Sequence, residues 1–168
     1  MHYHSEYAKL IFAEKAISEC SEYLQLFKDG YKANNRKRTI FERATSKAFI
    51  ITYAKPFLAS NKGTKEGYGS GSISTKWLSS CEAEIKTTHH QIVKLSRHLW
   101  VAHTNLALAE PEIKLTGPMQ QMVSSSQEYF LDEFGLSTLN KLLILCDNSI
   151  HSKMDIIRKQ IGNCEFKL

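Results

Sequence analysis

The chain has 168 residues, of which 42% are hydrophobic and 23% are charged, so it is long enough for one domain with a substantial core and short for two. Its net charge is +5, and no apolar run approaches the ~20 residues needed to cross a bilayer. The opening segment MHYHSEYAKL lacks the basic start and apolar centre of a signal peptide. We therefore expect a single domain over residues 1–168, located in the cytoplasm and without a membrane span.

Two amphipathic helices are predicted in the first part of the chain. The first runs from about Ser5 to Asp29, and Gly30 is a natural end for it. Its apolar positions are Tyr7, Leu10, Ile17, Cys20, Leu24 and Phe27. The second follows a polar connection and runs from about Arg36 to Leu58, and we expect Pro56 to bend or end it. Its apolar positions include Ile40, Ala44, Ala48, Ile51, Ala54 and Leu58.

A glycine-rich segment, residues 59–75, separates these helices from the next one. It holds four of the eight glycines but no dinucleotide fingerprint, because Ser72 stands where GxGxxG needs its last glycine. A third helix is predicted from about Lys76 to His103, with Ser74 or Thr75 as its N-cap. Its apolar stripe comprises Leu78, Cys81, Ile85, Ile92, Leu95, Leu99 and Ala102.

The last third of the chain is predicted to hold one short and one long helix. Leu106 to Pro118 is expected to be irregular, and a short helix follows within Met119 to Phe134, starting at Pro118. The final helix runs from about Ser137 to Ile161 on an apolar stripe of Leu139, Leu143, Cys146, Ile150, Met154, Ile157 and Ile161. Four long helices without strand alternation predict an all-α, up-and-down four-helix bundle with a glycine-rich loop between its second and third helices.

The cysteines and most histidines favour structural roles. Cys20, Cys81 and Cys146 lie on apolar stripes, where a reduced thiol is expected to be buried and inert; a thiol nucleophile or a metal site is the weaker alternative. Neither HExxH nor a zinc spacing occurs, so we expect no metal. His89 and His90 point about 100° apart on a helix, and we expect them not to share a site.

The end of the third helix, KLSRHLWVAHTN from Lys94 to Asn105, carries the pattern that indicates chemistry. Arg97 is followed directly by the polar His98. Five residues, His98 included, separate Arg97 from His103. This pattern resembles the HEPN superfamily, whose ribonuclease members carry an arginine, usually a polar residue after it, and a histidine, with four to six residues between the arginine and the histidine. The ending VAHTN is similar to the AH[ST][DN] endings common in that superfamily. Ten residues or so match in detail, and the helix order matches more loosely.

The resemblance implies a metal-independent endoribonuclease without a cofactor, of the toxin or abortive-infection type. His103 is then the general acid or base, since an imidazole titrates near pH 6.5, and Arg97 presents its planar donors to the phosphate. His98 helps to position the phosphate or Arg97. Thr104 or Asn105 fixes the His103 tautomer or caps the helix. RNA backbone contacts are expected from Lys94.

Helix geometry constrains how Arg97 and His103 act together. Six positions rotate by about 600°, which leaves the two residues about 120° and about 9 Å apart on a straight helix. Either the helix ends or bends before His103, or two copies of the chain build the site. The resemblance favours a two-fold dimer, in which one motif per chain is sufficient.

A basic segment between Lys28 and Lys47 has seven cationic and two acidic residues. Its net charge of +5 equals that of the whole chain. Such a segment attracts phosphate backbones, and we expect Arg43 and Lys47 to contact RNA; a solvated surface is the simpler alternative. Two other functions stay open. One is a catalytically silent HEPN module that binds a nucleotide or a partner protein, such as a nucleotidyltransferase antitoxin. The other is a purely structural bundle, in which His103 only complements the helix dipole.

Overall fold

The structure, a computed structural model, describes residues 2–33, 40–58, 73–104, 112–116, 119–123 and 130–161. Four long helices dominate these segments: α1 (His2–Ala33), α2 (Ile40–Ala54), α3 (Ala83–Thr104) and α4 (Leu136–Ile161). Three 3-10 helices accompany them: η1 (Lys55–Phe57), η2 (Lys76–Ser80) and η4 (Leu131–Phe134). Two short strands, β1 (Glu112–Thr116) and β2 (Met119–Val123), lie between α3 and α4 in the sequence.

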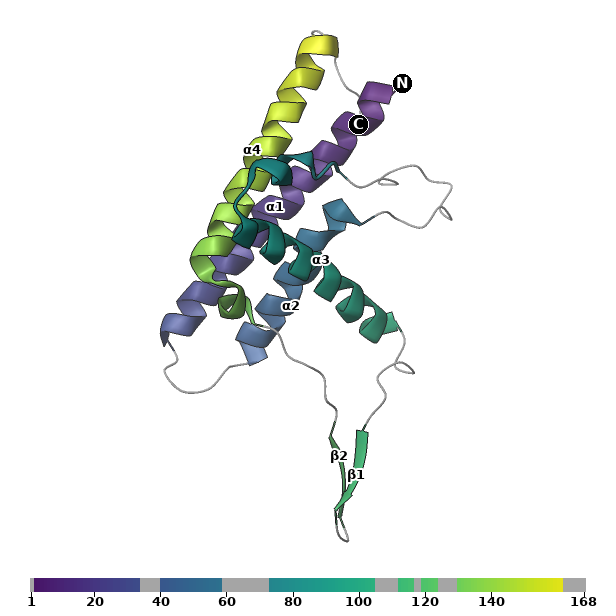
Figure 1. The fold of residues 1–168 in the computed structure, drawn as a ribbon, viewed down its shortest axis with the longest axis vertical. Coiled ribbons are helices and arrows are strands. Elements are labelled where there is room, and N and C mark those ends of the chain that lie inside the picture. Colours follow the sequence, from purple (N-terminus) through teal and green to yellow (C-terminus); the bar gives the residue numbers. More distant parts are fainter. Residues whose placement is uncertain are drawn as a thin grey trace.

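The long helices form an all-α bundle, as the sequence predicts, although α3 crosses the others and does not follow the predicted up-and-down course (Figure 1). α1 packs along both α2 and α4 and runs in the opposite direction to them, whereas α3 slants across α2 with a smaller contact to α4 (Figure 1). None of the helices in the described segments is at once long and apolar enough to cross a membrane.

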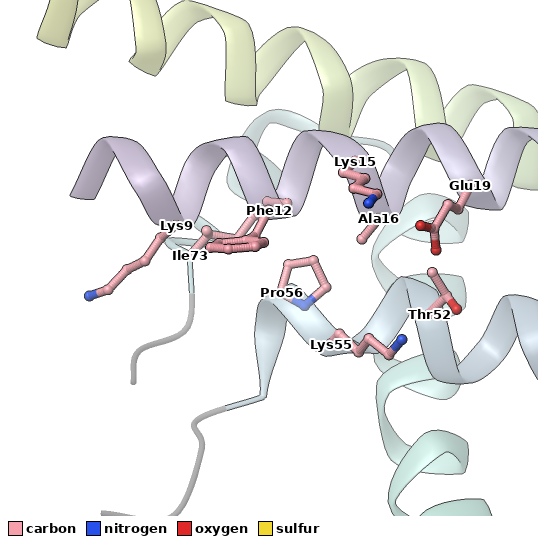
Figure 2. A pocket seen from close by; sticks show the side chains of 10 residues that line it. Lys9, Phe12, Lys15, Ala16, Glu19, Thr52, Lys55, Pro56 and Ile73 are labelled. Atoms are coloured by element: carbon pink, nitrogen blue, oxygen red, sulfur yellow. The ribbon is translucent and has the colours of Figure 1, made fainter. Parts of the chain in front are cut away.

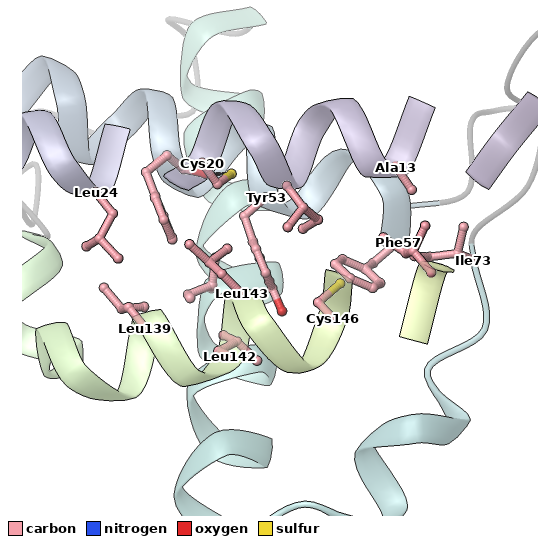
Figure 3. Packing of buried hydrophobic residues seen from close by; sticks show 14 of the residues in the cluster. Ala13, Cys20, Leu24, Tyr53, Phe57, Ile73, Leu139, Leu142, Leu143 and Cys146 are labelled. Carbon is pink, nitrogen blue, oxygen red and sulfur yellow. Dashed lines mark hydrogen bonds between the residues drawn. The ribbon is translucent and has the colours of Figure 1, made fainter. Parts of the chain in front are cut away.

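The core lies between α1, α2 and α4, and two of its three walls follow the predicted stripes. Every predicted core position of α1, from Tyr7 to Phe27, is buried. The same holds on α4 from Leu139 to Ile157, whereas the side chain of Ile161 lies outside the described residues. Figure 3 shows leucines of α4 meeting Leu24 and Tyr53 across this core. Burial of these apolar stripes is the main favourable contribution to the fold.

The buried face of α2 is shifted by about one residue from the predicted one, so the prediction is wrong there. Of the predicted stripe, Ala54 is buried, whereas Ala44 is exposed. The buried face instead carries Phe49, Tyr53 and Phe57, whose rings follow one another at centroid distances of 6.1 and 5.2 Å. Aromatic rings remove far more apolar area from water than alanines do, so the aromatic line, and not the alanine line, faces the core.

The ends of the first two helices also differ from expectation. α1 does not stop at Gly30 but continues to Ala33, and a Cβ at Gly30 would lie 3.5 Å from the ring of Phe41. Gly30 is therefore an interior helical position beside α2 and not a cap. The effect of Pro56 is confirmed, because α2 ends at Ala54 and Pro56 lies in the first turn of η1. The predicted start near Arg36 lies outside the described residues.

The predicted third helix is two elements. η2 covers Lys76–Ser80, Cys81 is extended (φ −83°, ψ 159°), and α3 begins at Ala83. The hydroxyls of Ser79 and Ser80 donate to the carbonyls of Lys76 and Trp77. Such local hydrogen bonds compete with a continuous helical ladder, which explains the break. The N-cap of η2 is Thr75, one of the two predicted caps, and it makes no side-chain capping hydrogen bond; the Ser74 hydroxyl accepts from the Lys76 amide at 3.3 Å.

The segment before α4 is where the sequence prediction fails most clearly. Met119–Val123 forms a strand and not a helix, and it pairs antiparallel with β1 in a register that sets Ile113 opposite Met122. The sequence signals for this strand pair were the Gly117–Pro118 dipeptide, which is typical of turns, and the alternation of polar and apolar residues in EIKLT. A 3-10 turn, η4, follows at Leu131, and residues 124–129 lie outside the described part of the chain.

The turn into α4 depends on Gly135, which has φ +74°. A Cβ there would also lie 3.2 Å from the Thr138 hydroxyl oxygen. We expect Gly135→Ala to lower the free energy of unfolding by about 1–2 kcal/mol, because a side chain at positive φ is strained. Urea unfolding measures the loss. Glu133→Ala, at an exposed position of the same turn, should stay within about 0.5 kcal/mol of the parent; equal stability of the two variants would contradict the claim of strain.

Candidate functional site

The first half of α3 is held firmly against the bundle. Ile85 and Ile92 are buried in the core, and the Thr138 hydroxyl at the start of α4 donates a hydrogen bond to the Glu84 carboxylate. Ser96, at the last position of α3 whose side chain is described, is 2% exposed and donates to the carbonyl of Val93. The bundle therefore fixes the direction in which α3 leaves it.

His89 is the main polar contact between α3 and α2. A 2.9 Å hydrogen bond joins its Nδ1 to the Tyr53 hydroxyl, and the rings of Phe57 and Trp77 pack edge-on against it, with centroids at 4.7 and 6.0 Å. Burial lowers the pKa of His89 to about 4, with a smaller effect from His90, so the imidazole is neutral at physiological pH. Burial likewise raises the pKa of Tyr53. This pair is a satisfied internal hydrogen bond through which α2 packs on α3.

The rings of His89 and His90 touch, which the spacing argument did not anticipate. Their centroids are 5.4 Å apart at an interplanar angle of 71°. Their environments still differ, because His89 is buried whereas His90 is exposed. Long side chains on adjacent helical positions can lean together although their Cβ atoms diverge. The contact places an exposed imidazole beside a buried neutral one.

The second half of α3 carries the predicted motif. The helix continues without interruption to Thr104 and therefore includes Arg97, His98 and His103. Figure 1 shows this end of α3 leading away from the other three long helices. The side chains from position 97 to position 104, and the whole of Asn105, lie outside the described residues.

The continuity of α3 decides one question that the sequence left open. The helix does not end before His103, so Arg97 and His103 are separated along one helix by about 120° and about 9 Å. Position 103 falls about five turns after Ile85 and so at the same helical phase, whereas position 97 falls within about 20° of the phase of His90. The two motif residues thus lie on different faces of the same helix.

The predicted RNA contacts lie on two helices. Lys94 is exposed on α3, one turn before Arg97. Arg43 and Lys47 lie one turn apart on α2 and are half-buried, so less of their charged surface faces solvent than the sequence suggested. Much of the remaining basic segment, including Arg36, lies outside the described residues.

The other reactive side chains of the described residues have structural surroundings. Cys20 and Cys146 are buried as predicted, and burial raises the pKa of both thiols; Cys81 is only half-buried. Within the described segments, no three His, Cys, Asp or Glu side chains gather to hold a metal ion. We therefore find no thiolate or metal centre to discuss for this part of the chain.

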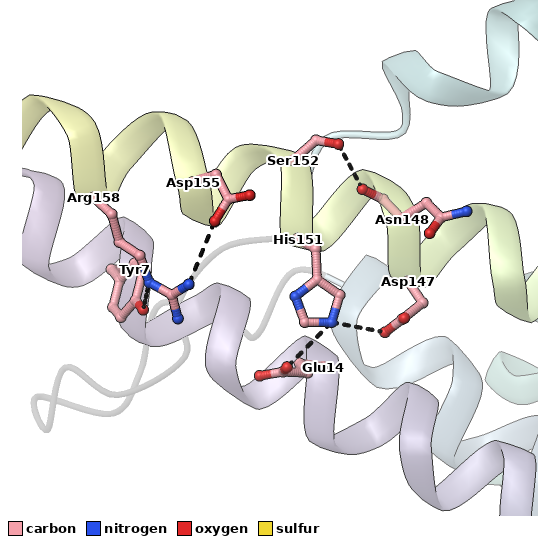
Figure 4. Close-up of polar contacts among 8 residues, drawn as sticks. All are labelled: Tyr7, Glu14, Asp147, Asn148, His151, Ser152, Asp155 and Arg158. Carbon is pink, nitrogen blue, oxygen red and sulfur yellow. Dashed lines mark hydrogen bonds and ion pairs between the residues drawn. The ribbon is translucent and has the colours of Figure 1, made fainter.

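A polar cluster links α1 and α4 at the surface (Figure 4). Nε2 of His151 lies 3.3 Å from a Glu14 carboxylate oxygen and 3.6 Å from one of Asp147. Further along, the guanidinium of Arg158 donates to the Tyr7 hydroxyl at 2.6 Å. The charged side chains of this cluster are each between about a third and two thirds exposed, and exposed ion pairs contribute little to stability, so the cluster offers no enclosed site.

A groove between α1 and the end of α2 was missed by the sequence analysis. Its lining comes from both helices and from Ile73, and it includes Lys9, Lys15 and Lys55 (Figure 2). No local pattern in the sequence indicated that Lys55 would lie opposite the lysines of α1.

Comparison with known proteins gives no assignment: the chain matches no family model, no curated protein and no solved structure.

Proposed function

We propose that this protein is a metal-independent endoribonuclease of the HEPN type that works as a two-fold dimer in the cytoplasm. The observation that carries the proposal is the uninterrupted course of α3 through Arg97 and His103 to Thr104, at the end of the helix that leads away from the bundle. A helix end in that position is accessible to a second copy. A two-fold axis there would bring the arginine and histidine of both chains into one cleft.

The proposed chemistry is an internal transesterification of RNA. The imidazole of His103 takes the proton of a ribose 2′-hydroxyl, and that oxygen attacks the adjacent phosphorus. The bond from phosphorus to the 5′-oxygen breaks, and the protonated imidazole of the same His103 gives its proton to the departing oxygen. The products are a 2′,3′-cyclic phosphate and a free 5′-hydroxyl. Arg97 stabilises the charge that develops on the phosphoryl oxygens.

The neighbouring residues have supporting roles under this proposal. His98 positions the phosphate or Arg97, and Thr104 or Asn105 holds His103 in the required tautomer. Exposed Lys94 binds the RNA backbone, with Arg43 and Lys47 as secondary contacts. A ribonuclease of this kind suits a toxin or phage-defence role and is expected to have an antitoxin partner.

Cleavage of single-stranded RNA in the presence of EDTA tests the proposal. We expect cleavage products with 2′,3′-cyclic phosphate ends and no cleavage when the riboses are 2′-O-methylated, because the nucleophile is then blocked. His103→Ala should cleave about 100- to 10,000-fold more slowly, since general acid–base catalysis contributes that much. End-group analysis by mass spectrometry and initial rates provide the readouts.

The matched control is His151→Ala, which removes an exposed histidine on a different helix and should leave the rate unchanged. Cleavage by His103→Ala at the parental rate would refute the assigned mechanism. If the parent does not cleave RNA but dimerises and captures a single partner protein, the silent HEPN module is the correct alternative.

A further inference from the structure

The groove between α1 and the end of α2 has the size of a small-molecule site. Its volume is about 320 Å³, within the range of ~300–1,000 Å³ typical of ligand pockets. Ala13 and Ala16 of α1 form part of its lining, and their small side chains leave the space open. The Ile73 amide donates to the Pro56 carbonyl at 2.8 Å, which holds Ile73 beside the groove.

One end of the groove presents an aromatic face to solvent. Phe12 is 56% exposed although it lies beside well-packed core residues. Figure 2 shows its ring next to Ile73, with Pro56 between this apolar end and the polar end. An exposed phenylalanine in a groove provides a surface on which a planar ring can stack.

The other end of the groove is cationic. Lys15 comes from α1 and Lys55 from η1, so two ammonium groups approach this end from opposite walls (Figure 2). Lys9 adds a third positive charge to the lining, against the single carboxylate of Glu19. Among the residues that the structure describes, none of the three lysines has an ion-pair partner. The described lining of the groove therefore has an excess of positive charge, three lysines against one carboxylate.

We propose that this groove binds a nucleoside phosphate, with the base stacked on Phe12 and the phosphate held between Lys15 and Lys55. Lysine binds phosphate as a point charge, and the Thr52 hydroxyl at the same end donates a further hydrogen bond. The proposal needs neither Arg97 nor His103 and is independent of ribonuclease activity.

The required chemistry, a planar base with its phosphate, has two sources. One is a free nucleotide and the other is a nucleotide within an RNA strand. Calorimetric titration of the full chain with adenosine monophosphate, and separately with a short 2′-O-methylated RNA that cannot be cleaved, distinguishes them. Adenosine and inorganic phosphate, each titrated alone, should bind more weakly than adenosine monophosphate, because each makes only half of the contacts.

We expect Phe12→Ala to weaken binding by about tenfold or more, which corresponds to the loss of one base–aromatic stack. The double variant Lys15→Ala/Lys55→Ala should weaken it at least as much and should remove most of its salt dependence. The matched controls are Leu26→Ala, a comparably exposed apolar residue of α1, and Lys141→Ala, an exposed lysine of α4. Both controls should bind within about twofold of the parent.

Each outcome has a definite meaning. Binding of adenosine monophosphate that is lost in both groove variants supports a free nucleotide, and the same sensitivity seen only with RNA supports a nucleotide within a strand. Binding of neither ligand, or binding that the groove variants do not change, overturns the proposal. Conversion of a dimer to a monomer by Phe12→Ala, without ligand binding by the parent, would show that a second copy of the chain covers the groove and would also overturn it.

Discussion

A heterodimer of Arg97→Ala and His103→Ala subunits is expected to regain about half of the parental ribonuclease activity, although each variant alone loses it almost completely. If Arg97 of one chain works with His103 of the other, such a heterodimer contains one complete arginine–histidine pair and one empty pair. The reason is the geometry of α3, whose continuous helix keeps the two residues of one chain on different faces. Co-expression with two affinity tags isolates the heterodimer for rate measurement.

The control is a doubly tagged dimer in which both subunits carry Arg97→Ala. It should stay about 100- to 1,000-fold below the parent, the loss typical of removing a charge-stabilising donor. A heterodimer as inactive as this control, measured beside an active parent, would show that each chain uses its own arginine and histidine. A monomeric active parent would have the same consequence, and in both cases the dimeric cleft would be wrong while RNA cleavage itself would stand.

Acidification is expected to remove about 3 kcal/mol of stability through His89 alone. The pKa of His89 is about 4 in the folded protein and near 6.5 in an unfolded chain. Between these values the unfolded state binds a proton that the folded state does not, so the stability falls as the pH drops from about 6.5 to about 4. Below that range this residue contributes no further change.

Urea unfolding of the parent and of His89→Gln at several pH values between 7 and 4 measures this effect. Glutamine keeps a hydrogen-bonding group near the Tyr53 hydroxyl but does not titrate, so the variant should lose about 3 kcal/mol less than the parent over the range. Gln91→Ala serves as the control, because Gln91 is exposed on the same helix and does not titrate, so its removal should leave the pH dependence close to that of the parent. Parallel curves for the parent and His89→Gln would mean that His89 is not held neutral by burial.

The helices whose apolar residues form one dominant stripe were predictable from sequence. α4 was expected from Ser137 to Ile161 and is found from Leu136, and its stripe is buried throughout its described side chains. α2 was not predictable in the same way, because alanines and aromatic residues offer two competing faces about 100° apart. Only contact with α1, α3 and α4 selects Phe49 and Tyr53 over Ala44.

The Arg97–His103 motif and the groove between α1 and α2 also differ in how far the sequence could predict them. The spacing of Arg97 and His103 is local, so the sequence was sufficient to place both on one helix and to calculate their separation. The spacing did not determine whether that helix ended before His103. In the structure α3 continues to Thr104. The groove was invisible in the sequence because Phe12 and Lys55 are far apart in the chain and meet only when α1 packs on α2.

By itself the sequence determined the helical class of the bundle, the core faces of α1 and α4, and the motif on α3, since each depends on residues within a few turns of one another. The tertiary structure decided the core face of α2, the contact between His89 and Tyr53, and the lysine-lined groove, which all require side chains from distant segments. Short-range periodicity fixes which residues share a helix face, whereas the choice between competing faces depends on the apolar area that a neighbouring helix can cover.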